Sequence, residues 1–106
     1  MAVTPAWAIS KLLTDYNLKK EDVQLFEINE AFAAVTLCSM KELDLSSEIT
    51  NVNVGSIAIG HPVGVTGARI VMTLIYELRR KGHSLGIASL CGAGAQGDAI
   101  LIQVEE

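Results

Sequence analysis

Aromatic residues, cysteines and long apolar runs are scarce in this sequence, and each shortage excludes a class of protein. Aromatic side chains make up 5% of the chain, so we expect an aliphatic core. The two cysteines are too few for a disulfide framework, which predicts a reducing, cytoplasmic compartment. No apolar stretch reaches the length of a membrane span. The first residues, MAVTPAWAIS, do not have the basic and apolar regions of a secretory signal.

Positive charge is scarce as well. The chain has 8 Lys and Arg against 12 Asp and Glu, a formal net charge of −4, and a single basic run, RRK at 79–81. Binding to the phosphate backbone of a nucleic acid depends on positive charge. Nucleic acid is therefore not an expected partner.

The length of the chain limits it to one domain, and we predict that this domain covers 1–106. Hydrophobic residues make up 50% of it, although a short chain buries a smaller fraction of its surface than a long one. We therefore expect some apolar side chains to contact another chain or a further part of the same protein.

Helix-like and strand-like segments alternate along the sequence, which predicts an α/β fold with a mixed sheet and packed helices. The predicted helices cover 4–17, 29–43 and 67–81. The predicted strands cover 24–28, 51–60, 85–90 and 98–104, and HPVGVTG at 61–67 is expected to turn the chain. The strand at 85–90 is apolar throughout, which favours burial on both faces.

Apolar periodicity predicts which side of each helix faces the core. The expected inward residues of the first helix are Ile9, Leu12, Leu13 and Tyr16, and those of the third are Ile70, Val71, Leu74, Ile75 and Leu78. The second helix differs, because AFAAVTLCSM at 31–40 contains no charged residue. Such a helix is expected to be covered on nearly every side.

The segment SLCGAGAQG at 89–97 contains the pattern G-x-G-x-x-G, which is typical of dinucleotide-binding loops. That pattern requires a following helix and an acidic residue about 20 positions later. Here an apolar strand follows and the sequence ends at Glu106, so the context excludes a nucleotide site. A glycine-rich turn can instead present backbone N–H groups to a developing oxyanion, with Cys91 before it as an acid or base.

Two further positions have the residue types that acyl chemistry uses. His61 lies between Gly60 and Pro62, and Asn29 and Glu30 follow a predicted strand, where α/β sheets present functional side chains. A structural alternative stands beside each: a turn histidine, an N-cap asparagine and a buried cysteine that acts only as a small hydrophobe. For Cys38 we favour that last interpretation, and His83 is expected to be exposed.

Three separated segments together resemble the C-terminal signatures of the thiolase family. They are FEINEAFA at 26–33, NVNVGSIAIGHPVGVTGAR at 51–69 and SLCGAGAQGDA at 89–99. The resemblance implies a thiolase-like layered fold, of which 1–106 is the C-terminal portion of one half. In that family two α/β halves pack together with helices between their sheets. The half that carries the nucleophilic cysteine has no counterpart in this sequence.

The resemblance also implies a chemistry, a reversible Claisen condensation or thiolysis of acetyl-CoA and acetoacetyl-CoA by an acyl-CoA acetyltransferase. Asn29 resembles the residue that fixes a water in an oxyanion hole, and His61 the one that activates the nucleophile and binds the thioester oxygen. Cys91 resembles the acid/base thiol, and the backbone N–H of Ala93 matches an oxyanion donor. Removal of an α-proton needs a positioned base and such donors. The resemblance implies no cofactor or metal, acyl-CoA substrates and a homo-oligomer.

The sequence departs from the family pattern at several positions. Ala93 and Ala95 interrupt the usual glycine run, VNVG replaces a more usual double glycine, and VGVTGAR differs from the common LGASGAR. We expect the isolated chain to be inactive, since the nucleophile is missing. The alternatives are a non-catalytic or split-subunit assembly module and a ketoacyl-synthase-like condensing enzyme. Cys91 argues against the latter, because those enzymes use a second histidine there.

Overall fold

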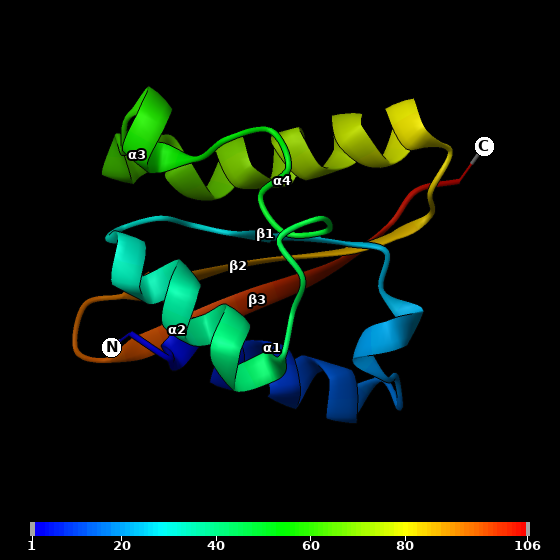
Figure 1. Ribbon diagram of the computed structural model, residues 1–106, viewed down its shortest axis with the longest axis horizontal. Coiled ribbons are helices and arrows are strands. Elements are labelled where there is room, and N and C mark those ends of the chain that lie inside the picture. The colour runs from blue at the N-terminus through cyan, green and yellow to red at the C-terminus, as the bar shows by residue number, and fades with distance from the viewer. Residues whose placement is uncertain (1, 106) are drawn as a thin grey trace.

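The computed structural model describes residues 2–105 and contains a three-stranded mixed sheet (Figure 1). Its strands are β1 (Leu25–Ile28), β2 (Leu85–Gly92) and β3 (Gln96–Gln103), in the order β1-β2-β3. β1 pairs parallel to β2, and β2 pairs antiparallel to β3. The predicted mixed sheet is therefore confirmed, and the apolar strand at 85–90 is its central strand.

Helices cover both faces of this sheet (Figure 1). α1 (Thr4–Asp15) and α2 (Ala33–Leu43) lie on one side, and α4 (Val63–Lys81) lies on the other. Two short helices, η1 (Lys20–Asp22) and α3 (Ser56–Ile59), belong to the connections. No helix among residues 2–105 is long and apolar enough to cross a membrane.

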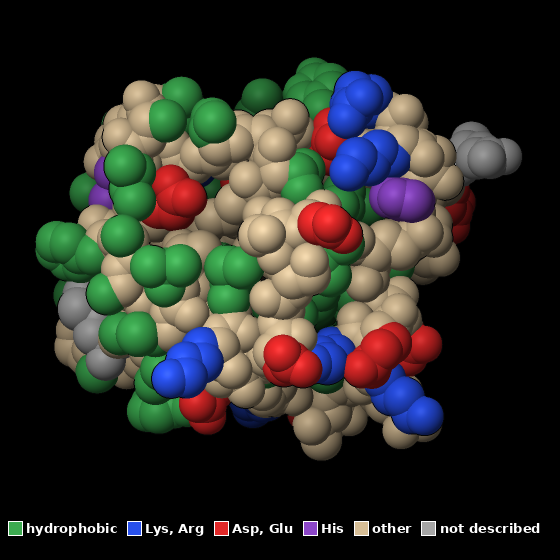
Figure 2. All heavy atoms as spheres, viewed as in Figure 1, with side chains coloured by type: hydrophobic (Ala, Val, Ile, Leu, Met, Phe, Trp, Pro, Cys, Tyr) green, Lys and Arg blue, Asp and Glu red, His purple; other side chains and the backbone are tan. Residues whose placement is uncertain are grey.

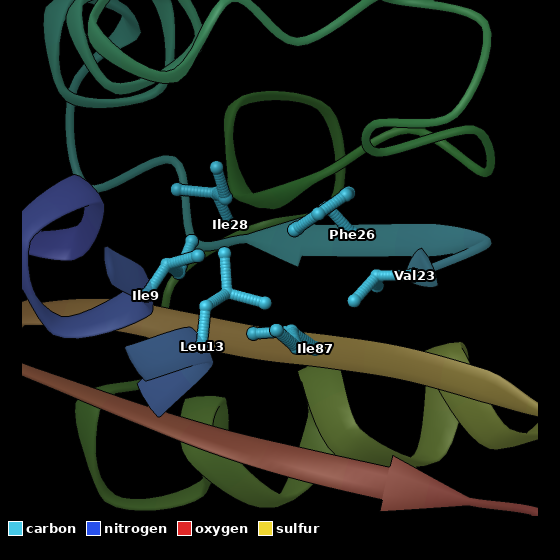
Figure 3. Close-up of a cluster of buried hydrophobic side chains, with 6 residues drawn as sticks. All are labelled: Ile9, Leu13, Val23, Phe26, Ile28 and Ile87. Atoms are coloured by element: carbon cyan, nitrogen blue, oxygen red, sulfur yellow. The ribbon is translucent and has the colours of Figure 1, made fainter. Parts of the chain in front are cut away.

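Two clusters hold these layers together, and Phe26 is the one aromatic side chain among their buried residues, as the low aromatic content predicts. On the α1 side the buried residues are Ile9, Leu13, Val23, Phe26, Ile28 and Ile87, and Figure 3 shows the side chains from α1 pointing toward those of the strands. On the α4 side they are Leu25, Ile70, Leu74, Leu78 and Ala88. Alternate residues of β1 and β2 thus pack into opposite clusters, because successive side chains of a strand point to opposite sides of the sheet.

The ends of the helices follow local rules. Pro5 lies in the first turn of α1, where its missing N–H is not needed. Asn17 and Gly82 adopt left-handed φ values of 53° and 68° after α1 and α4, as expected for helix stops. The inward stripe of α1 is shorter than predicted, because Tyr16 follows the helix and is 61% exposed.

The predicted strand at 51–60 is wrong. Only isolated bridges occur there, and residues 56–59 form α3, which Gly60 ends with a φ of 101°. The alternation that suggested a strand involves Ile57 and Ile59, which are both exposed. Their alternate spacing therefore does not mark the buried face of a strand. Over so short a segment, periodicity alone does not distinguish a strand from other structures.

Two helix starts also differ from the prediction. α2 begins at Ala33 instead of 29, because the backbone N–H of Asn29 donates to the Ser89 carbonyl and continues the sheet. α4 begins at Val63 instead of 67, so most of the predicted turn at 61–67 is helical. Pro62 is its N-cap, where no intrahelical hydrogen bond requires the N–H that proline does not have.

α2 is covered on one side only, against the expectation of burial on nearly every side. Val35, Thr36 and Ser39 are buried, whereas Leu37 is 63% exposed and Phe32, just before the helix, is 65% exposed. Hydrophobic side chains gather on the face of the molecule where α2 lies (Figure 2). This surface agrees with the apolar surplus noted in the composition.

Five described residues other than glycine have left-handed φ angles, and two of them, Val54 and Ala95, are neither Asn nor Asp. Val54 has a φ of 60° and Ala95 a φ of 58°. The resemblance to the thiolase family implies a glycine at both positions. Left-handed angles cost a residue with a Cβ about 1–2 kcal/mol, and they are most unusual for a β-branched side chain. Ala93 has no positive φ, so it needs no glycine.

We predict that Val54→Gly stabilises the fold, since glycine adopts this φ without strain. The expected gain in the free energy of unfolding is about 1 kcal/mol, after subtraction of the backbone entropy that glycine loses on folding. Denaturant unfolding followed by circular dichroism measures it. Val52→Gly is the control, because Val52 packs on the α4-side cluster without a positive φ, and this change is expected to destabilise the fold. Equal losses of unfolding free energy in both variants would show that the backbone at Val54 is not strained.

Candidate functional site

The parallel strands bring the predicted site residues to one end of the sheet. The carboxyl ends of parallel strands meet at the same edge, which is where α/β sheets commonly bind ligands. Asn29 follows β1, and Cys91 lies in the penultimate position of β2. α3, the beginning of α4 and the turn between β2 and β3 lie at this same end (Figure 1). His61 and Ala93 belong to these connections.

Asn29 presents a buried carboxamide at this end. Its side chain is 1% exposed, and its Oδ1 accepts a hydrogen bond of 2.5 Å from the hydroxyl of Ser56. Its Nδ2 has no hydrogen-bond partner within residues 2–105. A buried donor without a partner costs about 1–3 kcal/mol. Such a group in a native fold therefore points to an acceptor that the site receives from outside the chain.

His61 lies between α3 and α4, after the left-handed Gly60. Its side chain is exposed, and its Nδ1 shares a hydrogen bond of 2.7 Å with the hydroxyl of the buried Thr66. The Thr66 hydroxyl is also 3.0 Å from the carbonyl oxygen of Pro62. The first turn of α4 thus orients the imidazole and leaves Nε2 available for a reaction partner.

Cys91 is a free, buried thiol. It pairs with Gly97 across the hairpin, and alternation along β2 places it on the α1 face with Ser89. The Ser89 hydroxyl donates to the Pro5 carbonyl of α1 at 3.3 Å. A Cβ at Gly97 would overlap the carbonyl oxygen of Thr4, so close packing of α1 against the hairpin requires glycine opposite the thiol.

Ala93 occupies the exposed turn between β2 and β3. The left-handed angles of this turn fall on the two residues that follow it, Gly94 at 74° and Ala95 at 58°. Alanine at position 93 therefore keeps its backbone N–H in a turn that does not demand glycine there. Its role as an oxyanion donor stays a prediction from the resemblance.

The four residues share one end of the sheet but do not contact one another through hydrogen bonds among the described residues. Asn29 and His61 lie on the side of α3 and α4, as their bonds to Ser56 and Thr66 indicate. Cys91 belongs to the opposite face. A common role of these four residues around one substrate therefore stays a prediction. If they share a substrate, it would bind at this end of the sheet.

A buried ion pair behind Asn29 was missed by the sequence analysis. Glu27 is 3% exposed, and its Oε1 lies 3.5 Å from Nη1 of Arg69 on α4. Burial raises the pKa of Glu27 to about 7, although Arg69 lowers it, and the nearby charge of Glu30 adds to the rise. The signal in the sequence was a carboxylate inside the apolar strand LFEI.

Glu30 has a structural role. Its Oε1 accepts a hydrogen bond of 3.2 Å from the backbone N–H of Ile57, near the start of α3. Its Oε2 accepts from Nδ2 of Asn51 at 3.4 Å. A Cβ at Gly55 would overlap this carboxylate, so Gly55 is required for its position.

His83 is half-buried instead of exposed, with its Nδ1 3.0 Å from Nε2 of Gln24.

Comparisons with known proteins identify the family. The family model described as "Thiolase, C-terminal domain" matches residues 1–104. The chain belongs to the thiolase family. It is 50% identical over 99 residues to a probable acetyl-CoA acetyltransferase of Mycobacterium leprae, covering 93% of this chain and 25% of that protein. It is 47% identical to the cytosolic acetyl-CoA acetyltransferase of Rattus norvegicus, covering 97% of this chain and 26% of that protein.

Solved thiolases have the same fold. The acetyl-CoA acetyltransferase of Bacillus anthracis matches with a TM-score of 0.93 and 51% identity, over 96% of this chain and 26% of that chain. Human mitochondrial 3-ketoacyl-CoA thiolase in complex with CoA matches with a TM-score of 0.95 and 44% identity, over 99% and 27%. The thiolase-like α/β fold is therefore shown, and the chain spans about a quarter of the length of these relatives.

We predict that Glu27 makes the stability of this thiolase domain depend on pH. Its pKa is about 7 when folded against an ordinary 4.5, so the folded state holds the proton more tightly. Its contribution is complete below pH 4.5 and is lost as pH rises through 7, with a total on the order of 3 kcal/mol. Glu27→Gln removes this loss, so the variant gains stability relative to the parent between pH 5 and 8.

Urea unfolding at a series of pH values measures this difference. Glu42→Gln is the matched control, because Glu42 is exposed on α2. Its curve is expected to run parallel to that of the parent protein. If Glu27→Gln also ran parallel, the carboxyl would not titrate in this range.

Proposed function

We propose that this chain forms part of the active site of an acyl-CoA acetyltransferase that condenses two molecules of acetyl-CoA to acetoacetyl-CoA and cleaves the product with CoA. The observation that carries the proposal is the unpartnered Nδ2 of Asn29, at the end of the sheet to which the elements of His61 and Cys91 also lead. The names of the relatives support the same reaction. Because the chain spans about a quarter of them, the whole activity belongs to a larger assembly.

In the proposed reaction, Cys91 as thiolate removes an α-proton from acetyl-CoA. The Nε2–H of His61 and a water held by Nδ2 of Asn29 donate hydrogen bonds to the thioester oxygen and stabilise the negative charge that develops on it. The carbanion attacks an acetyl group carried by a cysteine of the N-terminal half, forming the new C–C bond and releasing that cysteine as thiolate. The Ala93 N–H stabilises the tetrahedral intermediate of this step. The proton stays on the Cys91 thiol until it is returned to the substrate in the reverse reaction or is lost to solvent.

The proposed partners are acyl-CoA substrates, the N-terminal half and further copies of the enzyme, with no cofactor or metal besides CoA itself. Among residues 2–105 no group of three or more His, Cys, Asp or Glu could hold a metal ion. A cytoplasmic location is also a proposal, because relatives include cytosolic and mitochondrial enzymes. A ketoacyl-synthase-like enzyme is not favoured, since the relatives are named acetyltransferases and thiolases.

The proposal predicts that activity appears only when the missing half is supplied. The test is a chimera in which this chain replaces the C-terminal quarter of the Bacillus anthracis enzyme, to which it is 51% identical. Thiolysis of acetoacetyl-CoA, followed by its absorbance, is expected from the chimera and not from the isolated chain. Clear turnover by the isolated chain would rule out the need for a second part. A correctly folded but inactive chimera would contradict the proposed activity.

Cys91→Ala in the chimera is expected to lower kcat by about 10²–10⁴-fold, the contribution of a general acid or base. Cys38→Ala is the matched control, because Cys38 is the other free thiol and lies half-buried on α2. It is expected to leave kcat unchanged. Equal activity of the two variants would exclude Cys91 as the acid/base.

A further inference from the structure

A chain of polar groups crosses the α4 side of the sheet and ends at Asn29. Glu27 and Asn29 are two residues apart along β1 and its extension, so they face the same side. Arg69 connects them from α4: its Nη1 lies 3.5 Å from Glu27 Oε1, and its Nη2 donates to Ser56 Oγ at 3.4 Å. Ser56, at the start of α3, then donates to Asn29 Oδ1 at 2.5 Å.

The donors and acceptors of this polar network can be matched in only one order. A guanidinium has donors only, so Ser56 accepts from Arg69. The single proton of the Ser56 hydroxyl is then directed to Asn29, which must offer an oxygen. If the carboxamide were turned over, its NH₂ would face Ser56 and the hydroxyl proton would lose its acceptor. The network therefore fixes which end of the carboxamide is oxygen and which is nitrogen.

The rest of the network holds Arg69 in place. Its Nη1 also donates to the hydroxyl of Thr73, one turn further along α4, at 3.4 Å. Glu27 is 3% exposed and Ser56 is 5% exposed, so water competes little for these bonds. A hydrogen bond in such surroundings is stronger than on the surface, and linked bonds reinforce one another.

We propose that Ser56, supported by Arg69, is a positioning residue that orients the Asn29 carboxamide and thereby presents Nδ2 to an oxygen acceptor at the end of the sheet. The acceptor class is a water or a thioester oxygen, which share the same hydrogen-bond chemistry. The catalytic consequence rests on the proposed function, whereas the orientation itself does not.

The orientation is tested on the chain alone by ¹⁵N NMR of the Asn29 side-chain NH₂ pair, assigned through its loss in Asn29→Asp. In the parent protein this pair is expected to be as ordered as the backbone. In Ser56→Ala its resonances shift and its order parameter falls, and in Ser56→Thr, which keeps the hydroxyl, the order is retained. Ser39→Ala is the matched control, because Ser39 is fully buried and donates to the Ala2 carbonyl at 3.2 Å. An ordered, unshifted Asn29 pair in Ser56→Ala overturns the proposal.

The consequence for catalysis is tested in the chimera by a double-mutant cycle. Ser56→Ala is expected to lower kcat by about 10- to 100-fold with KM unchanged, because a misplaced donor weakens binding of the transition state. In an Asn29→Ala background the same change is expected to have no further effect, since Ser56 acts through Asn29. A loss of equal size in both backgrounds would show that Ser56 does not act on catalysis through Asn29 and would overturn the catalytic part of the proposal.

The two tests separate this inference from the proposed function. If the NH₂ pair loses order in Ser56→Ala while kcat of the chimera is unaffected, the orientation holds and the catalytic role of Asn29 fails. If the chimera has no activity, the NMR result on the chain still decides the orientation. If the pair keeps its order while the chimera is active, the inference fails and the proposed function stands.

Discussion

The hydrogen bond from the Asn29 backbone N–H to the Ser89 carbonyl extends the parallel pairing of β1 and β2 beyond the last residue of β1. It keeps the chain extended where the sequence would otherwise begin a helix, and α2 starts only at Ala33. Asn29 is therefore held at the carboxyl edge of the sheet instead of on a helix. Because β2 runs in the same direction, its own end brings Cys91 and the following turn to that edge. Parallel pairing thus determines where the candidate site residues lie.

Several residues of this chain violate the rules of local structure or of burial. Glu27 places a carboxylate in a buried strand, Asn29 leaves a buried donor unpartnered, and Val54 and Ala95 adopt left-handed angles. Each would cost stability in an ordinary core. The Glu27 carboxylate and the Asn29 carboxamide are connected through Arg69 and Ser56, so they belong to one polar network. Such concentrations of local conflict are expected at functional sites.

The exposed apolar side chains agree with a thiolase domain that spans about a quarter of its relatives. Leu37 on α2 and Phe32 before it are more than half exposed, although the segment around them has no charge. A helix with this composition normally packs on two sides. The same physics that predicted extra contacts from composition explains why the structure leaves this face uncovered.

The sequence by itself determined the family, through three separated signatures, as well as α1, the central strand and the helix stops at Asn17 and Gly82. These features follow from residue types and their spacing within short segments of the chain. The false strand at 51–60 shows the limit of such local patterns, since the exposed Ile57 and Ile59 imitate a sheet period. Only the tertiary structure decided that Ser56 bonds Asn29, 27 residues earlier, and that Arg69 stands behind it. Serine and arginine are compatible with many surroundings, and only the packing of α3 and α4 on β1 selects which partners their hydrogen bonds reach.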